Sequence, residues 1–464
     1  MTAGSPPRKK LLSRRNLLIG GGAALVAAGG AGFVLRKRIK KFIANHTVLD
    51  SFRATPPLVP HDPEADRTTI YVARDAGPAV NVDTIFRKMG GVGTLIGPQD
   101  VVIIKVSAQW WNQGMTNVAA VKRTIEHILE IPGFAGDVIV FENTHFRLAD
   151  GSGLARAFTR PSDRNVDVEG MTRLGDLAPH FAAAGKPVSF VGLIDAGESA
   201  LSDDPWFDPG HEHGRYGGDG RGPIRDGEDR DGYFWDFDAT FRVKRSRLDY
   251  AQTPLTWPRF TCPRTQLVVD LRDGLFRRDG GKLVKVDRPL RFINMTTGNE
   301  HGSTGFTGAC KSSMGLVDMS AGELGTDPRV AGYQSIHYFG RIGKYNESWR
   351  MAGPLAFFCS RVRKPDLYVT VMEWTAITPA GGYDERDDMR HHPDCAVQTR
   401  TIVAGADPVA IDHWAVRNVV MKNPGAHADM NNLDDEHSKV NKFLRYYRQV
   451  AGSGTLDPAL VTVA

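Results

Sequence analysis

The sequence has few cysteines and few long apolar runs. Its 464 residues include 4 cysteines, all far apart, at positions 262, 310, 359 and 395. A ferredoxin-type cluster and a zinc ribbon both need Cys-x-x-Cys spacings, so neither is expected, and no iron–sulfur cluster is predicted. A single long apolar stretch excludes a polytopic membrane protein. The hydrophobic fraction of 41% and the charged fraction of 24% are those of a folded globular protein.

The chain also lacks a strong charge of one sign. The 58 basic and 53 acidic residues give a net charge of +5, and the basic excess is concentrated between residues 8 and 41. The remainder of the chain is slightly acidic. Nucleic acid is therefore not an expected partner.

Residues 1–42 are predicted to be a targeting or anchoring segment. Arg14 and Arg15 precede a Gly- and Ala-rich apolar run from Leu17 to Leu35, which resembles a twin-arginine export signal. The run is also about long enough to span a bilayer, and a basic cluster follows it, so an uncleaved membrane anchor fits as well. We expect an exported or membrane-anchored, extracytoplasmic protein that meets the twin-arginine export machinery, with a Pro-rich linker at residues 43–67.

From residue 68 to 464 the pattern predicts a single α/β domain. Val101–Val106 is a continuous apolar run, typical of a strand buried on both faces. Helical spacing follows over Val118–Glu130, and then a second apolar run at Asp137–Phe141. Strand, helix and strand at this spacing predict a mainly parallel sheet flanked by helices. Further strands are expected at Thr69–Val72, Val188–Leu193, Gln266–Leu271, Arg291–Ile293 and Leu367–Met372, and further helices at Val82–Met89, Pro408–Val420 and Glu436–Val450.

Residues 199–240 interrupt this pattern. The segment is rich in Gly, Asp, Arg and aromatic residues. Long loops in compact domains are usually functional or disordered, and the aromatic residues argue against disorder. We expect an ordered loop insertion over one edge of the sheet.

Three buried strands are each followed by, or end in, an ionisable residue: Lys105, Glu142 and Glu373. In open parallel sheets, ligands bind beyond the carboxyl ends of the strands. If these strands are neighbours, a cation and two carboxylates meet at one rim, where they could hold a metal or act as acid, base and charge clamp. Polarity also resumes at any strand end, so each residue alone means little.

The segment 297–315 is a Gly-rich loop with hydroxyl groups and a lysine. Exposed backbone N–H groups at Gly305, Thr307 and Gly308, together with Lys311, would make an anion or cofactor site. The loop lacks the Gly-Lys-Ser/Thr of a Walker motif. His301 is a further candidate metal ligand, beside Glu142 and Glu373. The alternative is a tight loop whose glycines serve backbone geometry only.

Asp407-Pro408 is typical of a helix N-cap followed by proline at the first helical position. Asp412 lies within that helix, where a buried carboxylate needs a partner, and Lys311 is the one we expect. Other metal candidates are weaker, since each also fits an exposed polar loop: His211 with His213, His391-His392 with Cys395, and the acidic run Asp226–Asp231.

Several of these stretches resemble the family called domain of unknown function 362. The two most specific are Thr307–Leu316, similar to its Thr-Gly-x-x-Lys loop, and Ala406–Asp412, similar to its Asp-Pro-Val-Ala-x-Asp helix start. The strand ending in Lys105, the Thr116-Asn117 pair and the strand beginning at Lys364-Pro365-Asp366 add weaker matches. The resemblance implies an α/β fold with its site near these motifs. Many members carry a cluster domain that this chain lacks, and Ser107 and Ser312 replace asparagines of the family pattern.

Two functions remain open at this stage. The first is an enzyme acting on a small anionic or carbonyl substrate, with or without a divalent metal. Its catalytic residues would be Lys105, Glu142, Lys311, Glu373 and Asp412. The second is a non-catalytic accessory protein that carries a cofactor or metal after export. A redox maturation factor is a third idea, which the scattered cysteines disfavour.

Overall fold

A computed structural model describes residues 67–144, 156–194, 223–244 without 226, 250–319, 348–377 and 392–464 without 426, together with scattered residues between 321 and 346. The predicted signal and almost all of the predicted linker lie outside these residues, as do His211, His213 and His391. Residues 53–464 form one compact unit. Within the described ranges, no helix combines the length and the apolar character that crossing a bilayer requires.

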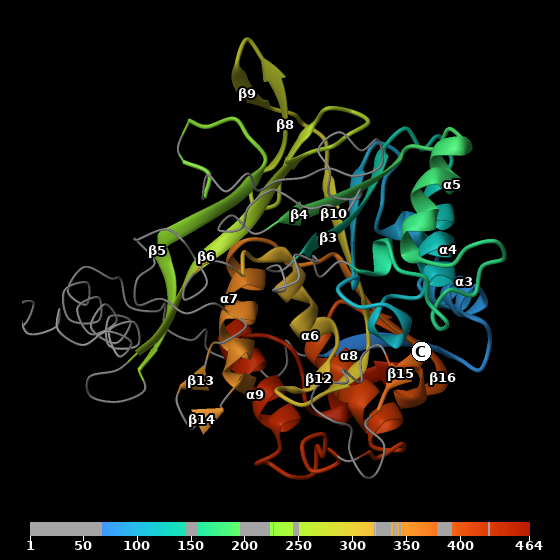
Figure 1. Ribbon diagram of the computed structural model, residues 1–464, viewed down its shortest axis with the longest axis vertical. Helices are drawn as coiled ribbons and strands as arrows, with labels where there is room; N and C mark the ends of the chain where they lie inside the picture. Colours follow the sequence, from blue (N-terminus) through green and yellow to red (C-terminus); the bar gives the residue numbers. More distant parts are fainter. Residues whose placement is uncertain are drawn as a thin grey trace, which may run out of the picture. The chain divides into compact units, whose positions relative to one another are not determined.

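An eight-stranded mixed sheet forms the centre of this unit (Figure 1). Seven strands run in one direction, and β16 alone is antiparallel to its neighbours β1 and β15. The mainly parallel α/β fold is thus confirmed. The strands lie in the order β17 (Val461–Val463), β1 (Thr68–Arg74), β16 (Ala396–Gly405), β15 (Leu367–Ala376), β10 (Leu290–Thr297), β2 (Val101–Val106), β3 (Asp137–Thr144) and β4 (Val188–Ile194).

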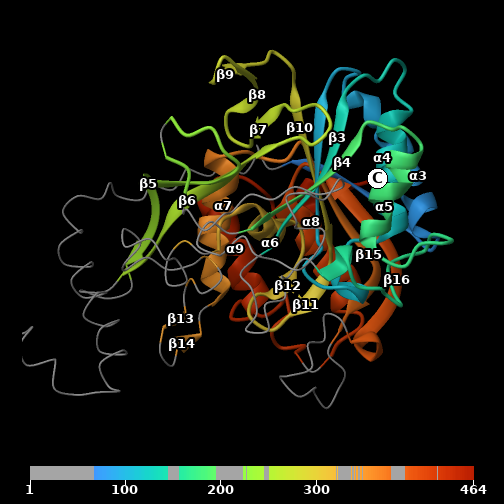
Figure 2. The same cartoon turned by 45° about the horizontal axis from the view of Figure 1, so that its top comes forward.

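One face of the sheet packs against α3 (Pro78–Lys88), α4 (Val118–Leu129) and α5 (Leu177–Ala183) (Figure 2). Alternate strand residues such as Val102, Ile104 and Val106 join the apolar sides of these helices in one buried cluster. Side chains alternate between the faces of a strand, so Ile103 and Lys105 point to the other face. Every residue of β2 is buried, as its continuous apolar run predicted.

The other face carries α6 (Ala309–Ser312), α7 (Ala352–Arg361), α8 (Pro408–Ala415) and α9 (Lys439–Ala451). Ala309 of α6 and Ala410 of α8 pack against Ile70, Tyr368 and Val403 of the sheet. The connection after β2 therefore leads to one face of the sheet, and the one after β10 leads to the opposite face.

A second, antiparallel sheet was not predicted. It runs in the order β5 (Gly232–Lys244), β6 (Tyr250–Thr261), β7 (Val268–Asp270), β8 (Gly274–Asp279) and β9 (Lys282–Lys285). Phe260 of β6 stacks on Phe141 of β3 at 5.1 Å between ring centroids, on the α6 face. The predicted loop 199–240 is wrong from residue 232 onward, because those residues form β5, where Tyr233 and Trp235 are buried.

Most of the remaining predictions hold with small shifts. The helix expected at Pro408–Val420 consists of α8 and a π-helical turn at Val416–Val420. Its N-cap is confirmed, because the Asp407 carboxylate accepts hydrogen bonds from Val409 and Ala410. β16 and α7 were missed. The first half of β16 alternates between partly buried and exposed residues, which gives a weak apolar signal.

Candidate functional site

A small cavity lies at the carboxyl ends of β2 and β10. These strands are neighbours, with Lys105 opposite Asn294 in register, and their connections leave to opposite faces of the sheet. Such a switch point opens a crevice where α/β sheets bind ligands. The cavity measures about 60 Å³ and we call it the lysine pocket. It is lined by Lys105, Ser107, Gln109, Trp110, Gly114, Glu142, Thr297, Asn299, Thr307, Lys311, Ser312, Met314 and Gly315.

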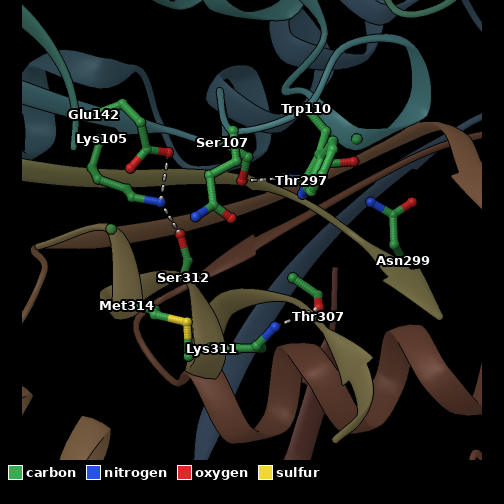
Figure 3. Close-up of a pocket in the computed structure, with 13 residues that line it drawn as sticks. Lys105, Ser107, Trp110, Glu142, Thr297, Asn299, Thr307, Lys311, Ser312 and Met314 are labelled. Carbon is green, nitrogen blue, oxygen red and sulfur yellow. Dashed lines mark hydrogen bonds and ion pairs between the residues drawn. The ribbon is translucent and has the colours of Figure 1, made fainter. Parts of the chain in front are cut away.

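Lys105 and Glu142 form a buried ion pair at one side of this pocket (Figure 3). The Lys105 Nζ lies 3.4 Å from the Glu142 Oε2 and donates to the Ser312 Oγ at 3.0 Å. Lys105 is 3% exposed and Glu142 is 2% exposed. The Glu142 carboxylate also accepts from the backbone N–H groups of Ala108 at 3.1 Å and Asn143 at 3.0 Å. The pair expected from the strand ends of β2 and β3 is therefore brought together.

Burial moves the pKa values of this pair toward each other. It lowers the pKa of Lys105, and the neighbouring Glu142 carboxylate opposes the shift. It raises the pKa of Glu142, against Lys105 and the two backbone donors. Desolvation disfavours the charged form of each group, so the difference between their proton affinities is smaller than it is in water.

The backbone after α6 lies directly on the ion pair. A Cβ atom added at Gly315 would come within 2.1 Å of the Glu142 Oε1 and 2.4 Å of the Lys105 Cε. Ser312 bridges the two sides, because its hydroxyl accepts from Lys105 and donates to the Asn294 Oδ1 at 2.8 Å. The absence of a side chain at Gly315 is what allows this approach.

Lys311 occupies another side of the lysine pocket, on α6. Its Nζ lies 2.9 Å from the His301 Nε2 and 3.4 Å from the Thr307 Oγ1. His301 and Thr307 come from the hairpin of β11 (Asn299–His301) and β12 (Gly305–Thr307). The other ring nitrogen, His301 Nδ1, accepts from the Ser303 N–H at 3.1 Å. Lys311 is 7% exposed and His301 is 8% exposed.

Asp412 supports the turn that carries Lys311, but through the backbone. Its two carboxylate oxygens accept from the N–H groups of Ala309 at 2.7 Å and Cys310 at 2.9 Å. The first two backbone N–H groups of α6 are thus used within the protein. Burial raises the pKa of Asp412 to about 7, and the two backbone hydrogen bonds oppose that shift.

The glycines expected to bind a cofactor have close structural neighbours. A Cβ at Gly308 would come within 2.3 Å of the Asp412 Oδ1, and one at Gly305 within 2.7 Å of the Met430 carbonyl oxygen and of Val440. Gly305 also has a φ of +81°, in the region that favours glycine. Neither lines the lysine pocket, whereas Thr307 does.

Glu373 lies apart from the other predicted site residues. Its Oε1 accepts from the Gln398 Nε2 of β16 at 2.9 Å and is 4.0 Å from the Arg400 Nε. Burial raises its pKa, and the Gln398 hydrogen bond opposes the shift. Glu373 does not line the pocket. The expected convergence of Lys105, Glu142 and Glu373 is therefore only partly realised, because β15 is separated from β2 by β10.

The described residues contain no group of three His, Cys, Asp or Glu side chains placed to hold a metal. Glu142, His301 and Glu373, the expected ligands, do not converge, and both His301 nitrogens already have hydrogen-bond partners. In the acidic run, Asp229 and Glu228 pair with Arg278 and Arg230. The expected divalent metal has no ligand set in the part of the chain that is described.

Five of the pocket residues that sequence reasoning did not name as site residues are Ser107, Gln109, Trp110, Thr297 and Asn299. The first three follow β2 directly, and the last two end β10 and begin β11. These residues could be recognised only from the strand order, because β2 and β10 are neighbours in the sheet but far apart in the sequence. A polar segment after an apolar strand marks these residues only when its neighbour in the sheet is known.

Comparison with known proteins supports the resemblance for part of the chain. Residues 286–417 match the model of the family described as Domain of unknown function (DUF362). This range includes β10, Lys311 and Asp412, while Lys105 and Glu142 lie before it. No curated protein and no solved structure matches the chain.

Proposed function

With a DUF362 domain at residues 286–417 and no reaction in that family's name, we propose a function from the chemistry of the lysine pocket. We propose that the protein is an enzyme acting on a small anionic or carbonyl compound bound there. The observation that carries this is the meeting of two buried lysines, Lys105 and Lys311, in one small polar cavity at the switch point between β2 and β10.

The size and the donors of the pocket define the class of ligand. A volume of about 60 Å³ suits a compound of a few heavy atoms. Hydroxyl groups of Ser107 and Thr307 add hydrogen-bonding groups around the lysines, whereas Thr297 and Asn299 donate to the Gln113 carbonyl oxygen. Buried amine and hydroxyl donors pair well with carboxylate, phosphate or carbonyl oxygens.

The Lys105–Glu142 pair acts as the acid and base that exchange protons with the ligand. Burial lowers the pKa of Lys105 and raises that of Glu142, which brings the proton affinities of the two groups closer together and suits proton exchange with a ligand. A binding protein needs charge complementarity only, whereas a buried pair with converging pKa values is what acid–base catalysis requires. This favours turnover over simple retention of a ligand.

A thermal-shift screen of the full chain tests the proposal. Pyruvate, glyoxylate, lactate and inorganic phosphate are the probes, and a ligand at a hundred times its Kd stabilises by about 2.7 kcal/mol, or a few degrees. The stabilisation is expected to disappear in Lys311→Met and to persist in Lys285→Met, which removes an exposed lysine of β9. No stabilisation by any of these compounds would contradict the proposal.

The second candidate is an exported accessory protein that holds a cofactor or a divalent metal without turnover. Elemental analysis of the full chain separates the two. About one metal ion per chain, retained through dialysis against a chelator, would favour the accessory role. Metal-free protein that is stabilised by the small carboxylates would favour the enzyme.

A further inference from the structure

We infer that Lys311 is held as an uncharged amine and forms an imine with a carbonyl substrate. This inference rests on the proposed function and narrows its substrate class to small aldehydes, ketones and oxoacids. The two lysines of the pocket then have different roles. Lys105 remains paired with a carboxylate, and Lys311 is the nucleophile.

The hydrogen bonds of His301 carry the inference. Its Nδ1 accepts from the Ser303 backbone N–H at 3.1 Å, so Nδ1 carries no proton. A neutral imidazole has one N–H, which must then lie on Nε2. The Nε2–H faces the Lys311 Nζ at 2.9 Å and donates to it. An ammonium group has three donors and no acceptor, so only the uncharged amine completes this contact.

Within the described part of the chain, charged and titratable groups near the amine come from several elements. His301 on β11 contacts Lys311 directly, and Lys105 of β2 and Glu142 of β3 line the same pocket. Asp412 of α8 is directed to the backbone of Ala309 and Cys310 at the start of α6. The Glu142 carboxylate is paired with Lys105 and accepts from two backbone N–H groups, and the Asp412 carboxylate accepts from two others.

The chemistry balances with the groups present. The Nζ lone pair attacks the carbonyl carbon, a C–N bond forms, and the carbonyl oxygen takes up the electron pair. One proton moves from nitrogen to this oxygen, and the Lys105–Glu142 pair supplies a second. Water then leaves as the C–O bond breaks, and the protonated imine remains. His301 is a positioning residue, since it orients the amine and makes no bond to the substrate.

Reductive trapping on the full chain tests the inference. The protein is incubated at pH 7 with pyruvate and sodium cyanoborohydride, which reduces an imine but not free pyruvate on this time scale. Peptide mass spectrometry then locates the reduced adduct. We expect at least a tenfold excess of adduct on Lys311 over the exposed Lys285. The half-labelling pH of Lys311 should lie well below the ordinary lysine value of about 10.4.

Two variants sharpen the result. In His301→Gln the amide oxygen can accept from an ammonium group, so the half-labelling pH of Lys311 should move upward toward that of Lys285. Lys311→Arg should bind the carboxylate probes in the thermal-shift screen but form no adduct. Pyruvate and lactate that stabilise the protein equally, with Lys311 labelled no faster than Lys285, would overturn the imine and leave the proposed function intact. Absence of any stabilisation would overturn the proposed function itself.

Discussion

At the scale of single residues, the Lys105–Glu142 pair has a large predicted effect on stability. Both side chains are almost completely buried. The Glu142 carboxylate pairs with Lys105 and also accepts hydrogen bonds from two backbone N–H groups. Removing one member of a buried pair leaves the other charge without its partner and costs about 3–5 kcal/mol.

The matching experiment is urea unfolding of Glu142→Gln. We expect the free energy of unfolding to fall by about 3–5 kcal/mol, because the amide also places a donor against a backbone N–H. Glu130→Gln is the control, since Glu130 belongs to a surface pair with Arg123 and should cost below about 1 kcal/mol. Equal losses in the two variants would show that burial of the Lys105–Glu142 pair is not energetically significant.

Asp412 gives a prediction with a defined pH window. Its pKa is about 7 in the folded state and near 3.9 in the unfolded chain. Between these values the folded state binds the proton more tightly, so the free energy of unfolding falls as pH rises from about 4 to 7. The stabilising contribution is complete below about pH 4, and the loss across the window is on the order of 4 kcal/mol.

Asp412→Asn should remove this component of the pH dependence. The free energy of unfolding is measured at several pH values between 4 and 7. The slope of this free energy against pH, rather than its absolute value, is compared between the variants. Asp394→Asn, at a site whose side chain is 78% exposed, should keep the wild-type slope. A slope unchanged in Asp412→Asn would contradict the assignment.

At the scale of elements, the turn after α6 packs closely on the Lys105–Glu142 pair because Gly315 has no side chain. Gly315→Ala would force a Cβ within 2.1 Å of the Glu142 Oε1. Overpacking of this kind costs about 1–3 kcal/mol and should also weaken binding of the carboxylate probes. Gly93→Ala is the control, because a Cβ there has no neighbour within 4 Å. Chemical unfolding and the thermal-shift screen measure the two effects, and equal behaviour of the variants would exclude the close approach.

The elements differ in how well the sequence predicted them. The strand Val101–Val106 was predicted to its exact ends because burial on both faces leaves an unbroken apolar run. The antiparallel strands β5 and β6 were missed, since Gly, Asp and Arg around buried aromatic residues look like a loop. Lys105 and Glu142 were predicted to meet because β2, α4 and β3 form one local unit, in which adjacency follows from the connection.

At the scale of the whole molecule, the site depends on pairings between distant segments. Leu290 of β10 lies opposite Val101 of β2, and no local pattern specifies that register. Strand order alone decides that Thr297 and Asn299 join Lys105, and that Glu373 of β15 does not. Lys311 was predicted as a site residue because its Gly-rich loop is a local pattern. Its contact with His301 depends on the folded hairpin, so His301 was predicted as a metal ligand instead.

Export remains a proposal that concerns the whole chain. We propose that residues 1–42 direct the protein out of the cytoplasm through the twin-arginine route or hold it at the membrane. Replacing Arg14 and Arg15 by lysine in the full chain should retain the protein in the cytoplasmic fraction, because the export machinery reads the arginine pair rather than its charge. Replacing Lys9 and Lys10 by arginine is the control. Unchanged fractionation of the Arg14→Lys/Arg15→Lys variant would contradict the proposal.

The most direct measurement of the central claim is a crystal structure of the full chain soaked with pyruvate. The account predicts ligand density in the lysine pocket between β2 and β10, with its carboxylate or carbonyl within hydrogen-bond distance of Lys105 or joined to the Nζ of Lys311. An unoccupied pocket in crystals of protein that pyruvate stabilises in solution, with the ligand bound at another site, would contradict it.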